Sequence, residues 1–133
     1  MTMMKHVLIA LSLMLCFSLQ AMAQDAGKKN EPKKSSEITI VGEVVDAQCY
    51  LQSGAKGDDH KQCAVDCAKG GIPLAILENK TGDVYFVGQT KNSMKGANDM
   101  LIDYASEQVS VTGKLVERGG AKMILMKSVA AAK

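Results

Sequence analysis

The fold is decided by the stretch Val111-Thr-Gly-Lys-Leu-Val-Glu-Arg-Gly-Gly-Ala-Lys-Met-Ile-Leu125. From Val109 to Leu115 apolar residues alternate with polar ones, which is the period of a strand with one buried face. Arg118-Gly-Gly120 supplies a turn, and the last expected strand, Met123–Val129, follows it. The pattern predicts a β-hairpin at the end of the chain.

Upstream of this hairpin, the apolar runs and turn residues predict three more strands and two helices. The expected strands are Ile38–Val45, Leu74–Leu77 and Val84–Val87, and the expected helices lie within 60–67 and 91–106. The turn Asn79–Gly82 joins the second and third strands as a hairpin. Gly70 and Gly71, followed by Pro73, end the first helix.

This order predicts a mainly β fold, a five-stranded barrel of the OB type. The 111–125 stretch resembles the last hairpin of many OB folds. Gly42 and Gly113 are expected to provide the strand bends that a small barrel requires, with a bulge or sharp bend at Gly42. The helix after the first strand is an insertion in this plan, and the second helix precedes the last hairpin.

The first 37 residues are expected to lie outside the domain. Lys5 precedes an almost entirely apolar run, Val7–Leu19, and Ala21-Met-Ala23 fits a small-x-small cleavage site. Residues 1–23 are therefore predicted to be a secretory signal peptide, cut after Ala23 and removing Cys16. Residues 24–37 are polar and read as a flexible linker. The folded domain, 38–133, is expected in the periplasm or outside the cell.

The distribution of charged residues indicates which classes of partner the protein can bind. The chain has a formal net charge of +2, but residues 38–133 carry 11 basic and 11 acidic side chains. A general nucleic-acid binder would show a basic excess, so that class is not expected. The four lysines of 24–37 predict at most a weak contact with an anionic membrane surface.

The main functional signal is a cluster of soft donors: Cys49, His60, Cys63 and Cys67. On a helix, positions 60, 63 and 67 fall within one narrow stripe. Two helical ligands four residues apart can chelate one ion, and the upstream thiol can close the site. This predicts a Cys3His metal site for Zn²⁺ or Cu⁺. Asp46 is expected to orient one of these ligands without binding the ion itself. Met94, Met100, Met123 and Met126 can extend a copper site but more often fill a core.

Two other interpretations of the thiols stay open. The three cysteines after residue 23 allow one disulfide, from Cys49 to Cys63 or Cys67, which would staple an interaction domain that docks on a larger exported or membrane complex. A thiol-redox protein is the third class, although the chain has no Cys-x-x-Cys. No Ser-His-Asp pattern, phosphate loop or paired catalytic carboxylates appear. A binding module is therefore expected rather than an enzyme.

Residues 40–90 also resemble a group of small exported bacterial proteins. The resemblance lies in Gly42-Glu-Val-Val-Asp-Ala-Gln-Cys-Tyr-Leu51, followed by Gly54, Gly57, His60, Cys63-Ala64, Cys67 and Gly71-Ile-Pro73. It implies that the cysteine and histidine spacing is a family signature. It implies no activity, so the chemistry has to come from the residues themselves.

Overall fold

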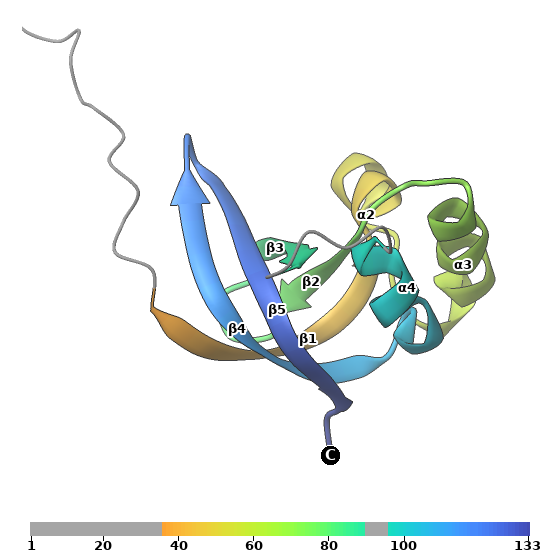
Figure 1. The fold of residues 1–133 in the computed structure, drawn as a ribbon. Helices are drawn as coiled ribbons and strands as arrows, with labels where there is room; N and C mark the ends of the chain where they lie inside the picture. Colours follow the sequence, from red (N-terminus) through yellow and green to blue (C-terminus); the bar gives the residue numbers. More distant parts are fainter. Residues whose placement is uncertain (1–35, 90–95) are drawn as a thin grey trace, which may run out of the picture. The chain divides into compact units, whose positions relative to one another are not determined.

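The computed structural model describes residues 36–89 and 96–133 (Figure 1). The expected signal peptide, almost all of the expected linker, and the first part of the expected helix 91–106, including Met94, lie outside the described residues. The first strand begins at Glu37, one residue before the predicted start of the domain.

The described part of the chain is mainly β, as predicted, with a five-stranded mixed sheet and short helices. The strands are β1 (Glu37–Asp46), β2 (Leu74–Glu78), β3 (Val84–Gln89), β4 (Gln108–Arg118) and β5 (Ala121–Ala131). The helices are α2 (Ala47–Ser53), α3 (Lys61–Lys69) and α4 (Ala97–Leu101), with single 3-10 turns η1 (Asp58–His60) and η2 (Ile102–Tyr104). The predicted hairpins are present as β2–β3 and β4–β5.

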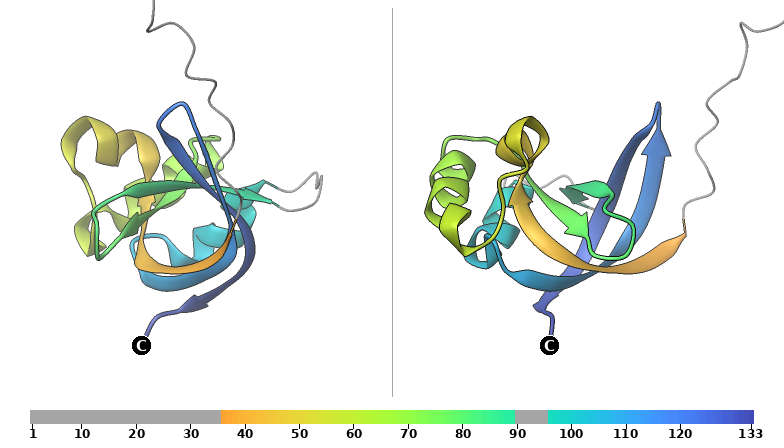
Figure 2. Two further views of the ribbon diagram at one scale, coloured as in Figure 1. Left: turned by 90° about the vertical axis from the view of Figure 1, so that its left-hand side faces the viewer. Right: turned by 180° about the vertical axis from the view of Figure 1, so that it is seen from behind.

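Each strand pairs with two neighbours, in the closed order β1-β2-β3-β5-β4 and back to β1. Every pairing is antiparallel except β3 with β5, which is parallel. Figure 2 shows the long, curved strands β1 and β4, with α2 and α3 together beyond one end of β1. The helices therefore gather where β1 ends and β2 begins.

The two strand glycines have different roles. The pairing of β1 with β2 and β4 runs through Gly42 without a shift, so the bulge expected there is not found. Gly42 is required instead because a Cβ at this position would lie 2.1 Å from the backbone oxygen of Leu77. The shift in register lies between Thr112 and Gly113, where the second bend was expected.

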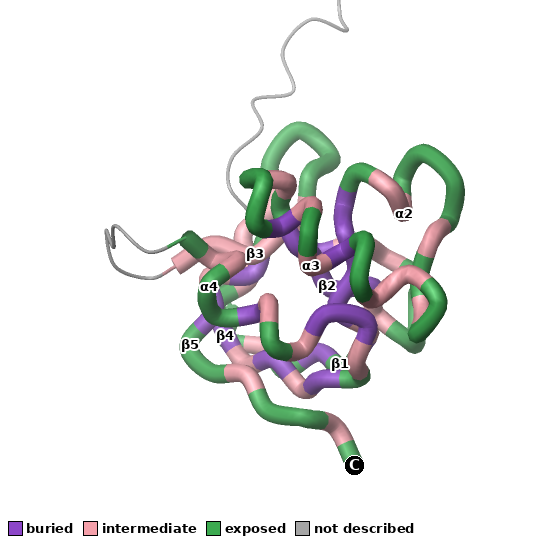
Figure 3. The backbone as a smooth tube through the Cα atoms, turned by 90° about the vertical axis from the view of Figure 1, so that its right-hand side faces the viewer, coloured by how far each residue is buried: buried purple, intermediate pink, exposed green. Residues whose placement is uncertain are grey.

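Two clusters of buried side chains form the interior. Figure 3 marks the buried residues along the backbone in purple. The larger one lies inside the sheet and includes Val44, Ile76, Leu101, Val109, Val111, Ile124 and Met126. The smaller one comprises Val45, Ala47, Ala75 and Leu77, against which Tyr50 packs from α2. Val44 of β1 packs in the larger cluster and its neighbour Val45 in the smaller one. The strand β1 therefore contributes to both clusters. No helix within the described ranges is long and apolar enough to cross a membrane.

Candidate metal centre

All of the predicted ligands lie between β1 and β2, in a connection anchored at both ends. Asp46 ends β1 and pairs with Leu74, which starts β2. The Ala47 amide donates a hydrogen bond to the Pro73 carbonyl oxygen at 3.1 Å. The connection thus leaves the sheet and returns to it at adjacent positions, and it contains α2, η1 and α3 rather than the single inserted helix that was expected.

Cys49 lies on α2, a helix that the sequence analysis missed. Asp46 is its N-cap and accepts a hydrogen bond from the Cys49 amide through Oδ1 at 3.0 Å. Gly54 ends it in the left-handed conformation, with φ of 73°, and its amide donates to the Tyr50 carbonyl. A capping Asp and a glycine eight residues later were the available signal. Because the helix is only seven residues long, its apolar period was too short to detect.

Cys63 and Cys67 lie one turn apart on α3, as predicted. Ala64 and Ala68 form the buried face of this helix, while Cys67 is half-buried and Cys63 is exposed. The thiols therefore lie at the edge of the buried stripe rather than within it. No Asp side chain caps the N-terminus of α3, because η1 extends it backward to Gly57.

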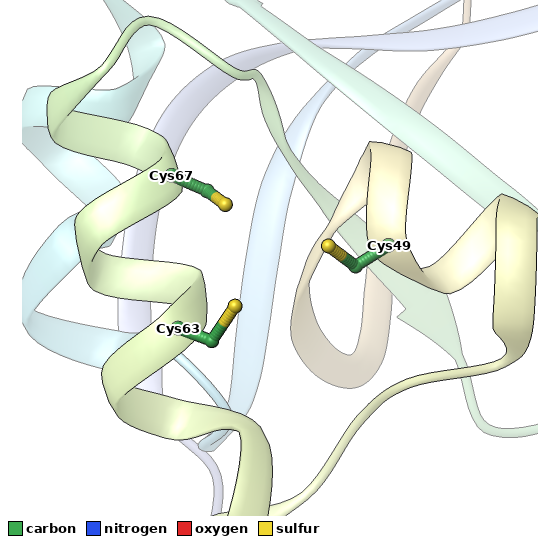
Figure 4. A group of neighbouring side chains, drawn as sticks. All are labelled: Cys49, Cys63 and Cys67. Carbon is green, nitrogen blue, oxygen red and sulfur yellow. The ribbon is translucent and has the colours of Figure 1, made fainter.

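The side chains of Cys63 and Cys67 point across a short gap toward Cys49 on α2 (Figure 4). The three sulfur atoms all lie within 4.8 Å of one another. Sulfur ligands about 2.3 Å from one zinc ion lie roughly 3.8 Å apart in a tetrahedral site. The three sulfur atoms are therefore close enough together to hold one metal ion.

His60 lies in a second group, with Asp46 and Cys49, whose ligand atoms are also within 4.8 Å of one another. Asp46 is fully buried. Its Oδ1 caps α2, whereas its Oδ2 and the Nε2 of His60 are buried without a hydrogen-bond partner. Cys49 is common to the two groups. The structure thus gathers every predicted site residue in one region, and the role of His60 as the fourth ligand of the thiol site stays a prediction.

Asp46, Cys49 and Cys67 lie close together, and they shift one another's pKa values. The neighbouring Asp46 carboxylate, together with burial, raises the pKa of the Cys67 thiol to about 12. Burial, and then the same carboxylate, raises the pKa of Cys49. Burial also raises the pKa of Asp46, but the Cys49 amide and the two thiols outweigh it, so the Asp46 pKa lies below its usual value. A bound cation would reverse the effect on the thiols, because coordination deprotonates them.

Two residues outside the connection hold α3 in place, and the sequence analysis missed both. Asn98, from α4, donates through Nδ2 to the carbonyl oxygens of Ala68 at 3.1 Å and Ile72 at 2.7 Å. Its Oδ1 accepts from the Leu74 amide at 2.9 Å. Lys61, at the start of α3, pairs with Glu107 at 2.7 Å. Asn98 has no local sequence signal, since its partners lie 24 to 30 residues away.

The methionines and the oxidation state of the cysteines do not change the composition of the thiol groups. Cys49, Cys63 and Cys67 are free thiols, and no disulfide joins them. Met126 lies in the sheet interior and fills the core, whereas Met100 and Met123 are exposed.

No protein-family model, curated protein or solved structure matches this chain.

Proposed function

We propose that this protein is a metal-binding module that holds Zn²⁺ or Cu⁺ on Cys49, Cys63 and Cys67. The observation that carries the proposal is the convergence of three thiols, from two separate helices, to within 4.8 Å of one another. Thiolates are the preferred ligands of both ions. Cys63 is exposed and the other two are half-buried, so an ion at this site is reachable by an incoming donor or acceptor.

The two ions make different demands on the site. Cu⁺ is satisfied by soft sulfur ligands, and three thiolates suffice. Zn²⁺ in a structural site takes four ligands. The Cys3His hypothesis assigns the fourth to His60, which lies beside Cys49 in the second group. The number of ligands that a bound ion shows by X-ray absorption spectroscopy therefore distinguishes the two ions and tests the place of His60.

A binding role fits these thiols better than thiol catalysis. A reactive cysteine needs a lowered pKa, since the thiolate is the nucleophile. Here the pKa values of Cys49 and Cys67 are raised by burial and by the Asp46 carboxylate. The disulfide-stapled interaction domain remains the alternative function, because the Cys49 sulfur lies within 4.8 Å of the sulfurs of Cys63 and Cys67.

The setting of the module is also a proposal. The closed strand order, the parallel β3–β5 pair and the position of α4 before the last hairpin support a barrel of the OB type. The apolar run and the cleavage pattern of residues 1–23 support export to the periplasm or beyond. The likeness of residues 40–90 to small exported bacterial proteins supports the same location.

The test is metal analysis of protein purified under anaerobic, reducing conditions, combined with a count of free thiols. We expect about one tightly held Zn²⁺ or Cu⁺ for the three thiols, and its loss in Cys63→Ser and Cys67→Ser. Cys16→Ser is the matched control, since Cys16 lies in the expected signal peptide. Protein without metal but with one disulfide by mass spectrometry would reject this function and favour the interaction domain.

A further inference from the structure

Two polar atoms beside the thiols have no partner. Among the residues that the structure describes, Asp46 Oδ2 and His60 Nε2 are the buried side-chain nitrogen and oxygen atoms without a hydrogen bond. Leaving such a group unpaired costs about 1–3 kcal/mol. Both atoms belong to residues whose ligand atoms lie within 4.8 Å of each other and of the Cys49 thiol. Two unpaired atoms in one place indicate a shared partner.

We propose that Asp46, His60 and Cys49 hold a second divalent cation of the Zn²⁺ class, next to the ion on Cys49, Cys63 and Cys67. The Cys49 thiolate then bridges the two ions. This inference rests on the proposed function, because the two sites share Cys49. It assigns His60 to the second ion and makes Asp46 a ligand rather than only an orienting group.

The fixed geometry of Asp46 favours this assignment. Its Oδ1 is held by the Cys49 amide at 3.0 Å, which leaves Oδ2 as the free ligand atom. The three donors come from the end of β1, from α2 and from η1, so the fold brings them together. One oxygen, one nitrogen and one sulfur suit a borderline divalent cation. Three protein ligands leave a fourth position open to solvent or to an incoming group.

The balance of charge favours two divalent ions over one. Three thiolates and the Asp46 carboxylate carry four negative charges, and a neutral imidazole adds none. One Zn²⁺ would leave two negative charges uncompensated beside a fully buried carboxylate, and one Cu⁺ would leave three. Uncompensated charge is unfavourable away from water. Two divalent cations bring the total to zero.

The simpler partners fit less well. A direct Asp46–His60 ion pair would satisfy both atoms, but no hydrogen bond or salt bridge joins them, and Nε2 remains unpaired. A buried water can bridge two such atoms, since ordered waters satisfy otherwise unpaired groups. A water would not involve the Cys49 thiol, and it would not compensate the negative charge of the Asp46 carboxylate. Water is therefore the outcome against which the cation has to be tested.

The test is a Zn²⁺ titration under anaerobic, reducing conditions, with bound metal counted by native mass spectrometry. The chain carries Cys16→Ser and His6→Ala, so that Cys49, Cys63, Cys67 and His60 are its remaining cysteines and histidine. We expect two ions per chain, and one in Asp46→Asn and in His60→Ala. Asn is an N-cap as good as Asp, so Asp46→Asn removes the charge and spares α2. Ser53→Ala, on the same helix, is the control and should keep two.

The possible results separate this inference from the proposed function. One ion in the parent chain, weakened by His60→Ala but not by Asp46→Asn, would overturn the second site and leave a single Cys3His site. One ion that neither substitution affects would mean that only water occupies the second group. No bound ion would reject both proposals. Co²⁺ gives an independent count, because its thiolate absorption should grow in two steps in the parent chain and in one step in Asp46→Asn.

Discussion

Asn98→Ala should destabilise the domain more than any other single change at a polar residue outside the thiol groups. The Asn98 side chain makes three hydrogen bonds, to the carbonyl oxygens of Ala68 and Ile72 and from the amide of Leu74. Each is expected to contribute about 0.5–1.5 kcal/mol. Leu74 is almost fully buried, so its amide would lose its partner without gaining water. We therefore expect a loss of about 2–4 kcal/mol in the free energy of unfolding.

The substitution should also weaken metal binding. Ala68 follows Cys67 directly, and Asn98 holds this end of α3 against β2. Without it, Cys67 loses its fixed position opposite Cys49. Urea unfolding and competition with a metal chelator measure the two effects. Asn98→Asp is an informative second variant. It keeps the acceptor for the Leu74 amide but turns an oxygen toward two carbonyl oxygens, so it should be at least as damaging.

Asn79→Ala is the matched control for this prediction. Its side chain donates one exposed hydrogen bond, to Gln108 Oε1 at 2.8 Å. Exposed substitutions of this kind usually change stability by no more than about 0.5 kcal/mol. If Asn98→Ala unfolds at the same urea concentration as Asn79→Ala, the side chain of Asn98 does not hold α3 in the way described.

Three further results are expected. Gly42→Ala should lower the melting temperature strongly, because the added Cβ would lie 2.1 Å from the backbone oxygen of Leu77. Gly96→Ala is the control and should leave the melting temperature unchanged, because its nearest atom would be 3.9 Å away. Equal melting curves for the two variants would contradict this prediction. The ion pair with Lys122 holds the pKa of Asp83 below its usual value. It therefore stabilises the fold above about pH 4 and loses that contribution as the pH falls through the lowered pKa, so Asp83→Asn should flatten the acid side of a stability–pH curve. Removing metal with a chelator should increase amide hydrogen exchange in α2 and α3 while β1 to β5 stay protected; uniform loss of protection would show that the metal holds the whole fold.

The sequence predicted the sheet well because its signals are local. The alternation from Val109 to Leu115, with a glycine turn at Gly119 and Gly120, fixes a hairpin without reference to the rest of the chain. The same holds for the hairpin around Asn79–Gly82. What the pattern did not fix is where the strands bend. Gly42 and Gly113 look alike in sequence, yet one permits close contact of two backbones and the other lies at the register shift.

The predicted site residues lie close together in the structure, but their arrangement in two groups was not predicted. The helical spacing of Cys63 and Cys67 gave the correct α3 face. The place of Cys49 depended on α2, a seven-residue helix whose caps outweigh its weak apolar period. That helix also buries Asp46, since its carboxylate turns to cap the first turn. Asn98 was beyond prediction, because its role exists only when α4 crosses the end of α3.

The separation of the thiols from the sheet interior would let the proposed ion exchange without unfolding the sheet. Of the α3 residues, Ala68 is the one that joins the large buried cluster, and the strands pair with one another in a closed order. In a zinc finger, by contrast, the metal supplies the folding energy. Here the sheet fixes both ends of the ligand-bearing connection, at Asp46 and Leu74, and Asn98 fixes the C-terminal end of α3. The ligands are therefore held near one another before an ion arrives, which reduces the ordering that binding has to accomplish. If the proposed function holds, a half-exposed thiol group set apart from the sheet interior suits a protein that takes up and releases metal better than one that uses metal to fold.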